Sequence, residues 1–570
     1  MKKLCLILAL IMLFVTACGQ PAVEQQPQPQ VEEEPETEVQ PEEGMKAGTY
    51  TAVCHGFYGD FDISVTVSES EIVDIQLGDY KETEAVGGKA LKIMTERMIE
   101  ENTAEVDLVS GATVTSMVFR SAVKDCLTQA NAPQSMLTAP PLPQVSEKTV
   151  DTDVLVIGGG AAGFASAISA AENGAKVTLI EKQDIVGGST IVSAGIVYGA
   201  LSEDDVPKMV DYYMERAEQK ADRDLLEFYA RNSIDTIAFL EGLGVKWMMN
   251  VPAGTAPEPR AHFSMHDDGT FMIGSALINP MEARARELGV EVLTGVKGTE
   301  LIVEDGEVIG AKAESKTANY TFNAKAVVLA TGGFDASEEL KEKYSPVAVG
   351  DFPLSNKGNV GEGLIMGIEA GAATEFKGGA IGFQIVDGSL PNSGYNASAM
   401  NATAFVKKDG TFVALGNDYP INYTNLKASG EKEFYGLYDA AGKDNAEPAL
   451  EKGFGFKADT VEELAELSGM DVEKLQDAFD KTEALATAPY YAVVVKPATI
   501  GSMGGLKINT RAEVLAEANN EPITGLYAAG EVANPGFYYQ EYPASGSSIS
   551  LSITYGREAG KNAAELAKIR

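Results

Sequence analysis

The chain has 570 residues, and 45% of them are hydrophobic, which is enough for several domains with buried cores. Its 83 acidic residues outnumber its 45 lysines and arginines, so the formal net charge is −38. Such a charge argues against nucleic acid as a partner and against electrostatic attraction to anionic lipid.

The first 17 residues predict a signal peptide. Lys2 and Lys3 precede an apolar run that is too short for an ordinary membrane helix, and a VTAC sequence ends at Cys18. This ending resembles a bacterial lipobox, which implies cleavage before Cys18 and attachment of lipid to its sulfur; plain secretion is the alternative. We therefore expect a lipoprotein anchored at Cys18 on the extracellular face of a bacterial cell membrane.

Residues 18–45 are rich in Pro, Glu and Gln and have almost nothing to bury, so they predict a disordered tether. In the folded part that follows, the cysteines are Cys54 and Cys126. An external location permits a disulfide between them, but their spacing does not support one, and two buried thiols are favoured.

Residues 46–132 predict a small α+β domain. Alternating residues indicate strands at 48–53, 62–67 and 72–77, followed by a helix at 88–100. The motif DLVSGATVTS then spans 107–116. Its small residues would expose a threonine hydroxyl on a turn, and a helix beginning near Ser116 would offer amides to a phosphate. A polar turn that merely caps a helix over 117–127 is the alternative.

The motif resembles the flavinylation motif of FMN-binding domains in sodium-pumping quinone reductase and related electron-transfer proteins. The resemblance implies that a flavin transferase attaches FMN to Thr113 through a phosphoester, and that Ser110, Gly111 and Ala112 complete the FMN site. The proline-rich residues 133–150 then predict a linker to the next domain.

Residues 153–182 predict a complete strand, glycine turn, helix and strand unit. An apolar strand at 154–157 leads into Gly158, Gly160 and Gly163, which have GxGxxG spacing. The glycines allow a tight turn, approach of a pyrophosphate and close packing of helix on strand, and Glu181 stands where an acid accepts ribose hydroxyls. A glycine-rich turn without a ligand is the weaker alternative. The pattern favours a Rossmann-type α/β domain.

Three later motifs favour FAD over NAD: small residues at 187–195, AVVLATGG at 326–333 and GLYAAGE at 525–531. Together the motifs resemble the flavoprotein superfamily of fumarate reductase, urocanate reductase and 3-ketosteroid dehydrogenase over residues 151–570. The resemblance implies an FAD domain at 151–380 and 500–570, with an inserted α+β cap (substrate) domain at 381–499. The expected FAD contacts are Gly158, Gly160, Ala162, Gly163, Glu181, Lys182, Gly188, Ser189, Thr190, Ala194, Gly195, Thr331, Gly332, Glu531, Ser547, Ser548 and Ile549.

Several other segments indicate structure without chemistry. Helices are expected at 206–219 and 223–243, a hairpin at 299–313 and two amphipathic helices within 460–488. His262 and His266 have i, i+4 spacing, which raises the question of a metal site. No third ligand stands out, so a role at a pocket rim or on the surface is favoured.

Arginine is absent between Arg286 and Arg511. Fumarate and urocanate reductases clamp a substrate carboxylate with arginines, since a guanidinium binds a carboxylate through two parallel hydrogen bonds. Alignment with their patterns places Tyr419 at the proton-donating arginine and Pro543 at a second clamping arginine. The segment IGSMGGL at 500–506 also lacks both histidines of the family pattern.

A tyrosine at this position and a Y-P-x-x-G segment near the C-terminus resemble 3-ketosteroid dehydrogenases. The resemblance implies that Tyr419 donates a proton, while the Tyr542 hydroxyl and the Gly546 amide bind a ketone oxygen. An aromatic residue of the cap core is the alternative for Tyr419. A further active-site tyrosine of that family, in the first half of the chain, has no clear counterpart here.

We therefore expect a flavin-dependent reductase of a conjugated C=C bond in a neutral enone such as a 3-oxosteroid. Electrons would pass from a membrane donor, quinol-linked or flavinylated, through FMN to FAD. One alternative is an enoate reductase for urocanate, cinnamate or a fumarate-like acid that binds the carboxylate through Lys407, Lys408, Arg260 or backbone amides. The other is an electron-transfer flavoprotein without a small substrate.

Overall fold

The computed structural model describes residues 44–141, 143–251, 258–271, 273–386, 393–416 and 418–570. The expected signal peptide, Cys18 and almost all of the tether lie outside these residues. No helix within the described ranges is both long and apolar enough to cross a membrane.

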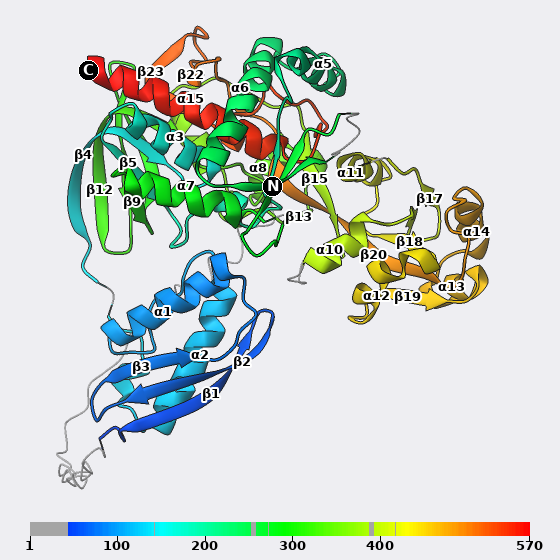
Figure 1. The fold of residues 1–570 in the computed structure, drawn as a ribbon, viewed down its shortest axis with the longest axis horizontal. Coiled ribbons are helices and arrows are strands. Elements are labelled where there is room, and N and C mark those ends of the chain that lie inside the picture. The colour runs from blue at the N-terminus through cyan, green and yellow to red at the C-terminus, as the bar shows by residue number, and fades with distance from the viewer. Residues whose placement is uncertain (1–43, 142, 252–257, 272, 387–392, 417) are drawn as a thin grey trace, which may run out of the picture. The chain divides into compact units, whose positions relative to one another are not determined.

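The N-terminal domain is a three-stranded antiparallel sheet with two helices packed on it (Figure 1). The central strand alternates buried and exposed residues, as expected for a sheet with one face on a core. Cys54 and Cys126 are buried free thiols, as the sequence favoured. The elements are β1 (Gly48–Gly56), β2 (Gly59–Val67), β3 (Ile72–Leu77), η1 (Glu84–Gly88), α1 (Lys89–Glu100) and α2 (Thr113–Gln129).

Helix α2 starts at Thr113, three residues before the expected start near Ser116. Gly111, with φ +96°, turns the chain early, and the Ser116 hydroxyl fastens the turn by donating to the Ala112 carbonyl at 2.9 Å. Thr113 is therefore the first helical residue, and it is exposed.

An eight-stranded sheet forms the centre of the second domain. Its main order is β10-β11-β12-β4-β5-β9, and β23 pairs with β12. β4 begins at Ser146, inside the expected linker, because residues 146–150 pair with β12. The strands are β4 (Ser146–Ile157), β5 (Val177–Glu181), β9 (Glu291–Thr294), β10 (Lys297–Glu304), β11 (Glu307–Glu314), β12 (Ala318–Leu329), β22 (Glu513–Leu515) and β23 (Pro522–Ala528).

The expected hairpin is confirmed as β10 and β11. Asp305 and Gly306 in its turn have φ of +51° and +82°. Two consecutive positive φ values are what a two-residue turn between twisted strands requires.

Helix α15 (Ser547–Ile569) packs closely along α3 (Ala161–Glu172). A Cβ on Gly556 would lie 2.6 Å from the Ala162 carbonyl oxygen, and one on Gly560 would collide with the Ser166 carbonyl. This approach fixes the middle of α15 against α3.

Other helices of this domain are α4 (Gly188–Ile191), α5 (Val206–Arg216), α6 (Arg223–Gly242), α7 (Ser275–Glu287), α8 (Glu338–Tyr344) and α9 (Glu362–Glu369).

The two histidines at 262 and 266 do not share a helix. His262 lies on β8 (Ala261–Met265) in a small sheet with β6 (Ile196–Tyr198) and β7 (Lys246–Val251), and it packs edge-on against Trp247. His266 Nε2 lies 3.0 Å from the Ser275 hydroxyl. Among the described residues, no three His, Cys, Asp or Glu side chains form a metal-binding group.

The expected cap is a second sheet with helices on it, inserted between the two parts of the second domain (Figure 1). Its long strand β20 pairs with four others and leads back toward the second part of that domain. The elements are β13 (Phe352–Pro353), β15 (Ala380–Ile385), α10 (Ser393–Met400), β16 (Ala404–Lys407), β17 (Phe412–Val413), α11 (Tyr419–Ala428), β18 (Phe434–Tyr438), α12 (Lys443–Leu450), β19 (Gly455–Ala458), α13 (Val461–Ser468), α14 (Val472–Asp480) and β20 (Tyr490–Ser502).

Candidate active site

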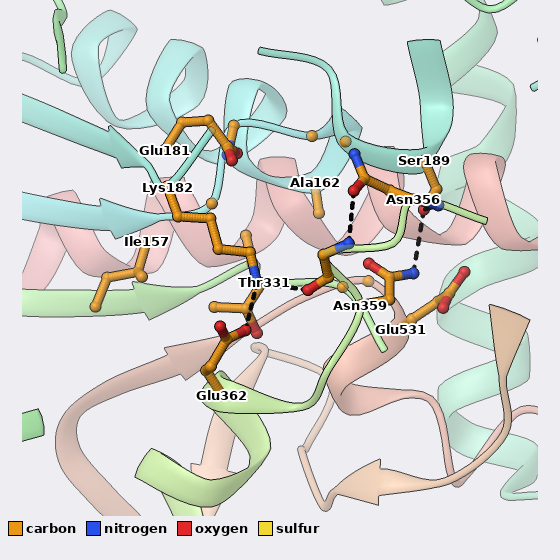
Figure 2. Close-up of a pocket in the computed structure, with 18 of the residues that line it drawn as sticks. Ile157, Ala162, Glu181, Lys182, Ser189, Thr331, Asn356, Asn359, Glu362 and Glu531 are labelled. Atoms are coloured by element: carbon orange, nitrogen blue, oxygen red, sulfur yellow. Dashed lines mark hydrogen bonds and ion pairs between the residues drawn. The ribbon is translucent and has the colours of Figure 1, made fainter. Parts of the chain in front are cut away.

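A cleft opens where the parallel strands of the large sheet end (Figure 2). Ligands of open α/β sheets bind at this edge, beyond the carboxyl ends of the strands. Most of the expected FAD contacts line the cleft: Gly158, Gly160, Ala162, Glu181, Lys182, Gly188, Ser189, Thr190, Thr331, Gly332 and Glu531. Gly163, Ala194, Gly195, Ser547, Ser548 and Ile549 do not line it.

The three motif glycines have different surroundings. A Cβ on Gly158, where φ is +111°, would collide with the Ala330 carbonyl, and one on Gly163 would collide with the Gly158 carbonyl. A Cβ on Gly160 would meet nothing nearer than the Gly187 carbonyl oxygen at 3.9 Å. The fold therefore requires glycine at positions 158 and 163. A side chain at position 160 would instead extend into the cleft. This open cradle fits a pyrophosphate.

Glu181, at the end of β5, is fixed by two backbone amides. Its Oε2 accepts from the Gly159 N–H at 2.7 Å, and its Oε1 accepts from the Gln183 N–H at 2.9 Å. Burial raises the pKa of this carboxyl, and the two amides oppose that effect. Its position in the cleft fits an acceptor for ribose hydroxyls.

The opposite wall comes from residues 356–362, which the sequence did not suggest. Lys182 Nζ lies 2.5 Å from Glu362 Oε2 and also donates to the Gly358 carbonyl (Figure 2). Asn356 exchanges two side-chain hydrogen bonds with Gln183, at 2.6 and 2.9 Å, and Asn359 donates to the Ser189 hydroxyl. The turn-forming sequence SNKGNVG at 355–361 is the signal that could have found this wall.

Two acids, the buried Asp335 and the half-buried Glu531, interact electrostatically near the cleft. Asp335 accepts from the Ser355 hydroxyl at 2.7 Å and from Thr499 at 3.2 Å. Burial raises its pKa, while burial and then the Asp335 carboxyl raise the pKa of Glu531. The raised pKa favours the protonated form of Glu531, which lines the cleft.

Tyr419 and Tyr542 come together beside the start of α15. The Ser545 hydroxyl donates to Tyr419 Oη at 3.1 Å, and the Ser548 N–H donates to Tyr542 Oη at 2.8 Å. Burial, and then the nearness of Tyr419, raises the pKa of Tyr542; burial also raises that of Tyr419. Each hydroxyl is used as an acceptor, so each keeps its single proton for donation.

Gly546 stands between these contacts as the residue before α15. Its φ is +91°, and a Cβ would lie 2.9 Å from the Ile196 carbonyl oxygen, so the position requires glycine. Within the described part of the chain, its N–H donates to no protein acceptor.

Further aromatic residues surround the pair, and the sequence did not single them out. The Tyr538 ring packs edge-on against Tyr542, with centroids 5.6 Å apart, and Phe383 packs against Tyr419 at 5.2 Å. The buried Tyr538 hydroxyl has no hydrogen-bond partner in the described structure. The run FYYQEYP at 537–543 is the signal that could have found this aromatic wall.

The cations named for the enoate alternative are engaged elsewhere. Arg260 is fully buried and binds Asp205 through Nε at 2.7 Å and Nη2 at 2.8 Å. Lys407 Nζ donates to the Ser429 carbonyl, and Lys408 lies 3.2 Å from a carboxylate oxygen of Glu433. Arg260 would have to leave a buried partner before it could bind a substrate carboxylate, whereas Lys408, which pairs with Glu433, is exposed.

A family model described as "FAD binding domain" matches residues 153–549. The chain belongs to this family. A second model, described as "FMN-binding domain", matches residues 56–128. The protein is therefore a flavoprotein with an FMN-binding domain before its FAD-binding domain.

Relatives agree with this assignment. The chain is 30% identical to urocanate reductase of Eggerthella lenta, with 92% of this chain and 93% of that protein covered. The open conformation of a flavocytochrome c3 fumarate reductase matches with a TM-score of 0.62 and 28% identity, covering 73% and 79% of the two chains. A 3-ketosteroid-Δ4-(5α)-dehydrogenase of Rhodococcus jostii matches in fold, with a TM-score of 0.61, 23% identity and coverage of 74% and 100%. The protein is an FAD-dependent oxidoreductase that acts on carbon–carbon double bonds.

Proposed function

We propose that the protein reduces the conjugated C=C bond of a neutral enone, such as a 3-oxosteroid. The pair of Tyr419 and Tyr542 supports this proposal most strongly, because both hydroxyls accept from the 545–548 turn and keep their protons for a substrate. Neutral donors suit a neutral carbonyl, whereas arginine binds a carboxylate more strongly through two parallel charge-assisted hydrogen bonds.

In this proposal the Tyr542 hydroxyl and the Gly546 N–H bind the carbonyl oxygen. The negative charge that develops on this oxygen is stabilised by two donors already held in place, one by the Ser548 amide and the other by the fold of the turn. A preorganised donor of this kind is worth about 3 kcal/mol in a site that excludes water.

Tyr419 then donates its proton to the carbon next to the carbonyl. A tyrosine hydroxyl is protonated at neutral pH, which is the state that a proton donor needs, and burial raises the pKa of Tyr419 further. Bound FAD supplies the hydride chemistry at the other carbon of the double bond. Phe383 packs against Tyr419 and Tyr538 packs against Tyr542, so the two proposed donors have aromatic neighbours that suit a hydrophobic substrate.

We also propose that electrons arrive at the cell surface. The VTAC sequence at Cys18 supports a lipid anchor, and the exposed Thr113 at the start of α2 supports covalent attachment of FMN by a flavin transferase. A membrane donor, quinol-linked or flavinylated, would then reduce the FMN, from which electrons pass to FAD.

A pair of substrates that differ in one group tests the proposed role of the carbonyl. Enzyme reduced by an artificial electron donor is given a 3-oxo-4-ene steroid or the matching 3-hydroxy-4-ene steroid, and the products are identified by mass. We expect saturation of the double bond in the ketone alone. Equal rates for both compounds would show that the carbonyl is not bound by Tyr542 and Gly546.

A further inference from the structure

The loop after β5 borders the FAD cleft on one side and the N-terminal domain on the other. Lys182 and Gln183 line the FAD cleft, and the next residue, Asp184, contacts the flavinylation motif of the N-terminal domain. Ile185 continues this contact, since a Cβ on Gly111 would lie 3.9 Å from it and 3.7 Å from Gln183. Residues 182–185 thus connect the FAD cleft, at Lys182 and Gln183, with the turn that precedes Thr113, which Gln183, Asp184 and Ile185 border.

Asp184 holds this turn through several hydrogen bonds. Its Oδ2 accepts from the Ser110 N–H at 2.8 Å and from the Ser110 hydroxyl at 2.6 Å, while Ser110 Oγ in turn accepts from the Asp184 N–H at 2.8 Å. Its Oδ1 accepts from Arg97 Nη2 at 2.7 Å. One carboxylate therefore joins helix α1 and the flavinylation turn to the FAD domain.

The charge of Asp184 suits this role. Burial alone would raise its pKa, but the bonds from Ser110 and Arg97 outweigh burial and hold the pKa below its ordinary value. The Asp184 side chain is 21% exposed to solvent, and the Arg97 side chain is 28% exposed. A hydrogen bond to a charged, partly buried group contributes more than one between exposed groups.

Other contacts across the same boundary are weaker. Lys316 and Asp107 form an ion pair at 2.7 Å, but their side chains are 67% and 62% exposed. Lys89 lies 3.4 Å from Glu282, at the edge of a cavity lined by α1 and η1 on one side and α7 on the other. The exposed pair contributes little, and the half-buried Lys89–Glu282 pair is a single contact. Asp184 makes four hydrogen bonds across the boundary and is therefore the centre of the contact.

We propose that Asp184 is the positioning residue that docks the FMN domain on the FAD domain and so sets the rate of electron transfer between the two flavins. This inference rests on the proposed attachment of FMN to Thr113. Asp184 touches neither the reacting carbon atoms nor, in this account, the substrate. Its loss would leave both flavins bound but would let residues 107–113 separate from the loop after β5.

The test compares Asp184→Ala with Lys316→Ala in the full-length flavinylated protein. FMN is reduced first with a fast artificial donor, and the reduction of FAD is followed by stopped-flow absorbance. We expect Asp184→Ala to slow this step on the order of tenfold, which is the factor expected from about one lost charged hydrogen bond, and Lys316→Ala to leave it unchanged. The content of both flavins should equal that of the wild type in both variants.

Hydrogen exchange provides a readout that does not depend on activity or on FMN attachment. The amides of residues 107–113 should exchange faster in Asp184→Ala than in wild type or Lys316→Ala, in protein prepared with or without the flavin transferase. Unchanged exchange together with an unchanged rate of FAD reduction would overturn the docking role. If Thr113 carries no FMN but exchange still rises, the docking contact stands and the proposed electron path fails.

Discussion

The hydroxyl of Tyr419, at the first position of α11 in the cap, accepts a hydrogen bond from Ser545, which precedes α15 in the FAD domain. This contact joins the two parts of the chain that would enclose a substrate. It also leaves the Tyr419 proton free for transfer.

Tyr419→Phe removes the proposed proton donor and keeps the ring. We expect turnover of an enone to fall on the order of 10²-fold, with both flavins retained, because a positioned general acid contributes about that much. Tyr423→Phe is the matched control in the same helix, since its hydroxyl donates to the buried Asp351 at 2.8 Å. The control should lose about 1–3 kcal/mol of unfolding free energy and keep its turnover. If both variants keep full turnover, Tyr419 is a packing residue.

Tyr542→Phe removes one of the two proposed donors to the carbonyl oxygen. We expect kcat/KM for the enone to fall by an amount equivalent to about 2–4 kcal/mol, the range for one lost oxyanion donor. The loss should be confined to substrates with a carbonyl. An equal loss on a substrate without a carbonyl would point to general damage to the site.

Gly160→Val should abolish FAD binding while the protein stays folded. A Cβ at Gly160 would enter open space in the cleft, where the pyrophosphate would lie. The substitution should therefore weaken FAD binding and not folding. Gly163→Ala should instead destabilise the protein by about 1–3 kcal/mol, because its Cβ collides with the Gly158 carbonyl. Extraction and separate measurement of FAD and FMN, together with thermal unfolding, distinguish the two effects. Normal FAD content in Gly160→Val would contradict this assignment of the cradle.

Thr113→Ala should remove covalent FMN. In protein made with a flavin transferase, the intact mass should exceed the mass of the mature polypeptide by one FMN less water, and the denatured protein should fluoresce. Thr115→Val is the control, since the Thr115 hydroxyl is already bonded to Glu82 at 2.8 Å. Covalent flavin that survives in Thr113→Ala would place the attachment elsewhere.

Asp418 should make the unfolding free energy depend on pH between about 4 and 6. Burial raises its pKa to about 6, although the Tyr419 N–H and the charge of Arg216 lower it. Below pH ~4 both the folded and the unfolded chain hold this proton. As the pH rises toward 6, the unfolded chain releases it first, so the unfolding free energy falls by at most about 3 kcal/mol. Asp418→Asn, measured by denaturant unfolding at several pH values, should remove this part of the slope; an identical slope would contradict the assignment.

Local patterns predicted the parts of the site that lie within one stretch of chain. The strand, the glycines and Glu181 fall within 153–182, and their roles follow from a turn that any such sequence must make. The earlier start of α2 was missed because Gly111, rather than a capping side chain, ends the preceding turn.

The opposite wall of the FAD cleft was not predicted, because its contacts cross long stretches of sequence. Lys182 and Glu362 are 180 residues apart, and Asn356 and Gln183 are 173 apart. Neither pairing leaves a local pattern. The same reason applies to Asp184 and Ser110, which are 74 residues apart. Tyr538 and Tyr542 are close in sequence, but a run of aromatic residues does not show which rings pack together.

The most direct test of the central claim is reoxidation of the photoreduced wild-type protein by single additions of a 3-oxo-4-ene steroid, urocanate, cinnamate or fumarate. The flavin absorbance should return rapidly with the enone and slowly or not at all with the three acids, and Tyr419→Phe should slow the enone reaction. Rapid reoxidation by an acid with no response to the enone would contradict the claim and identify an enoate reductase.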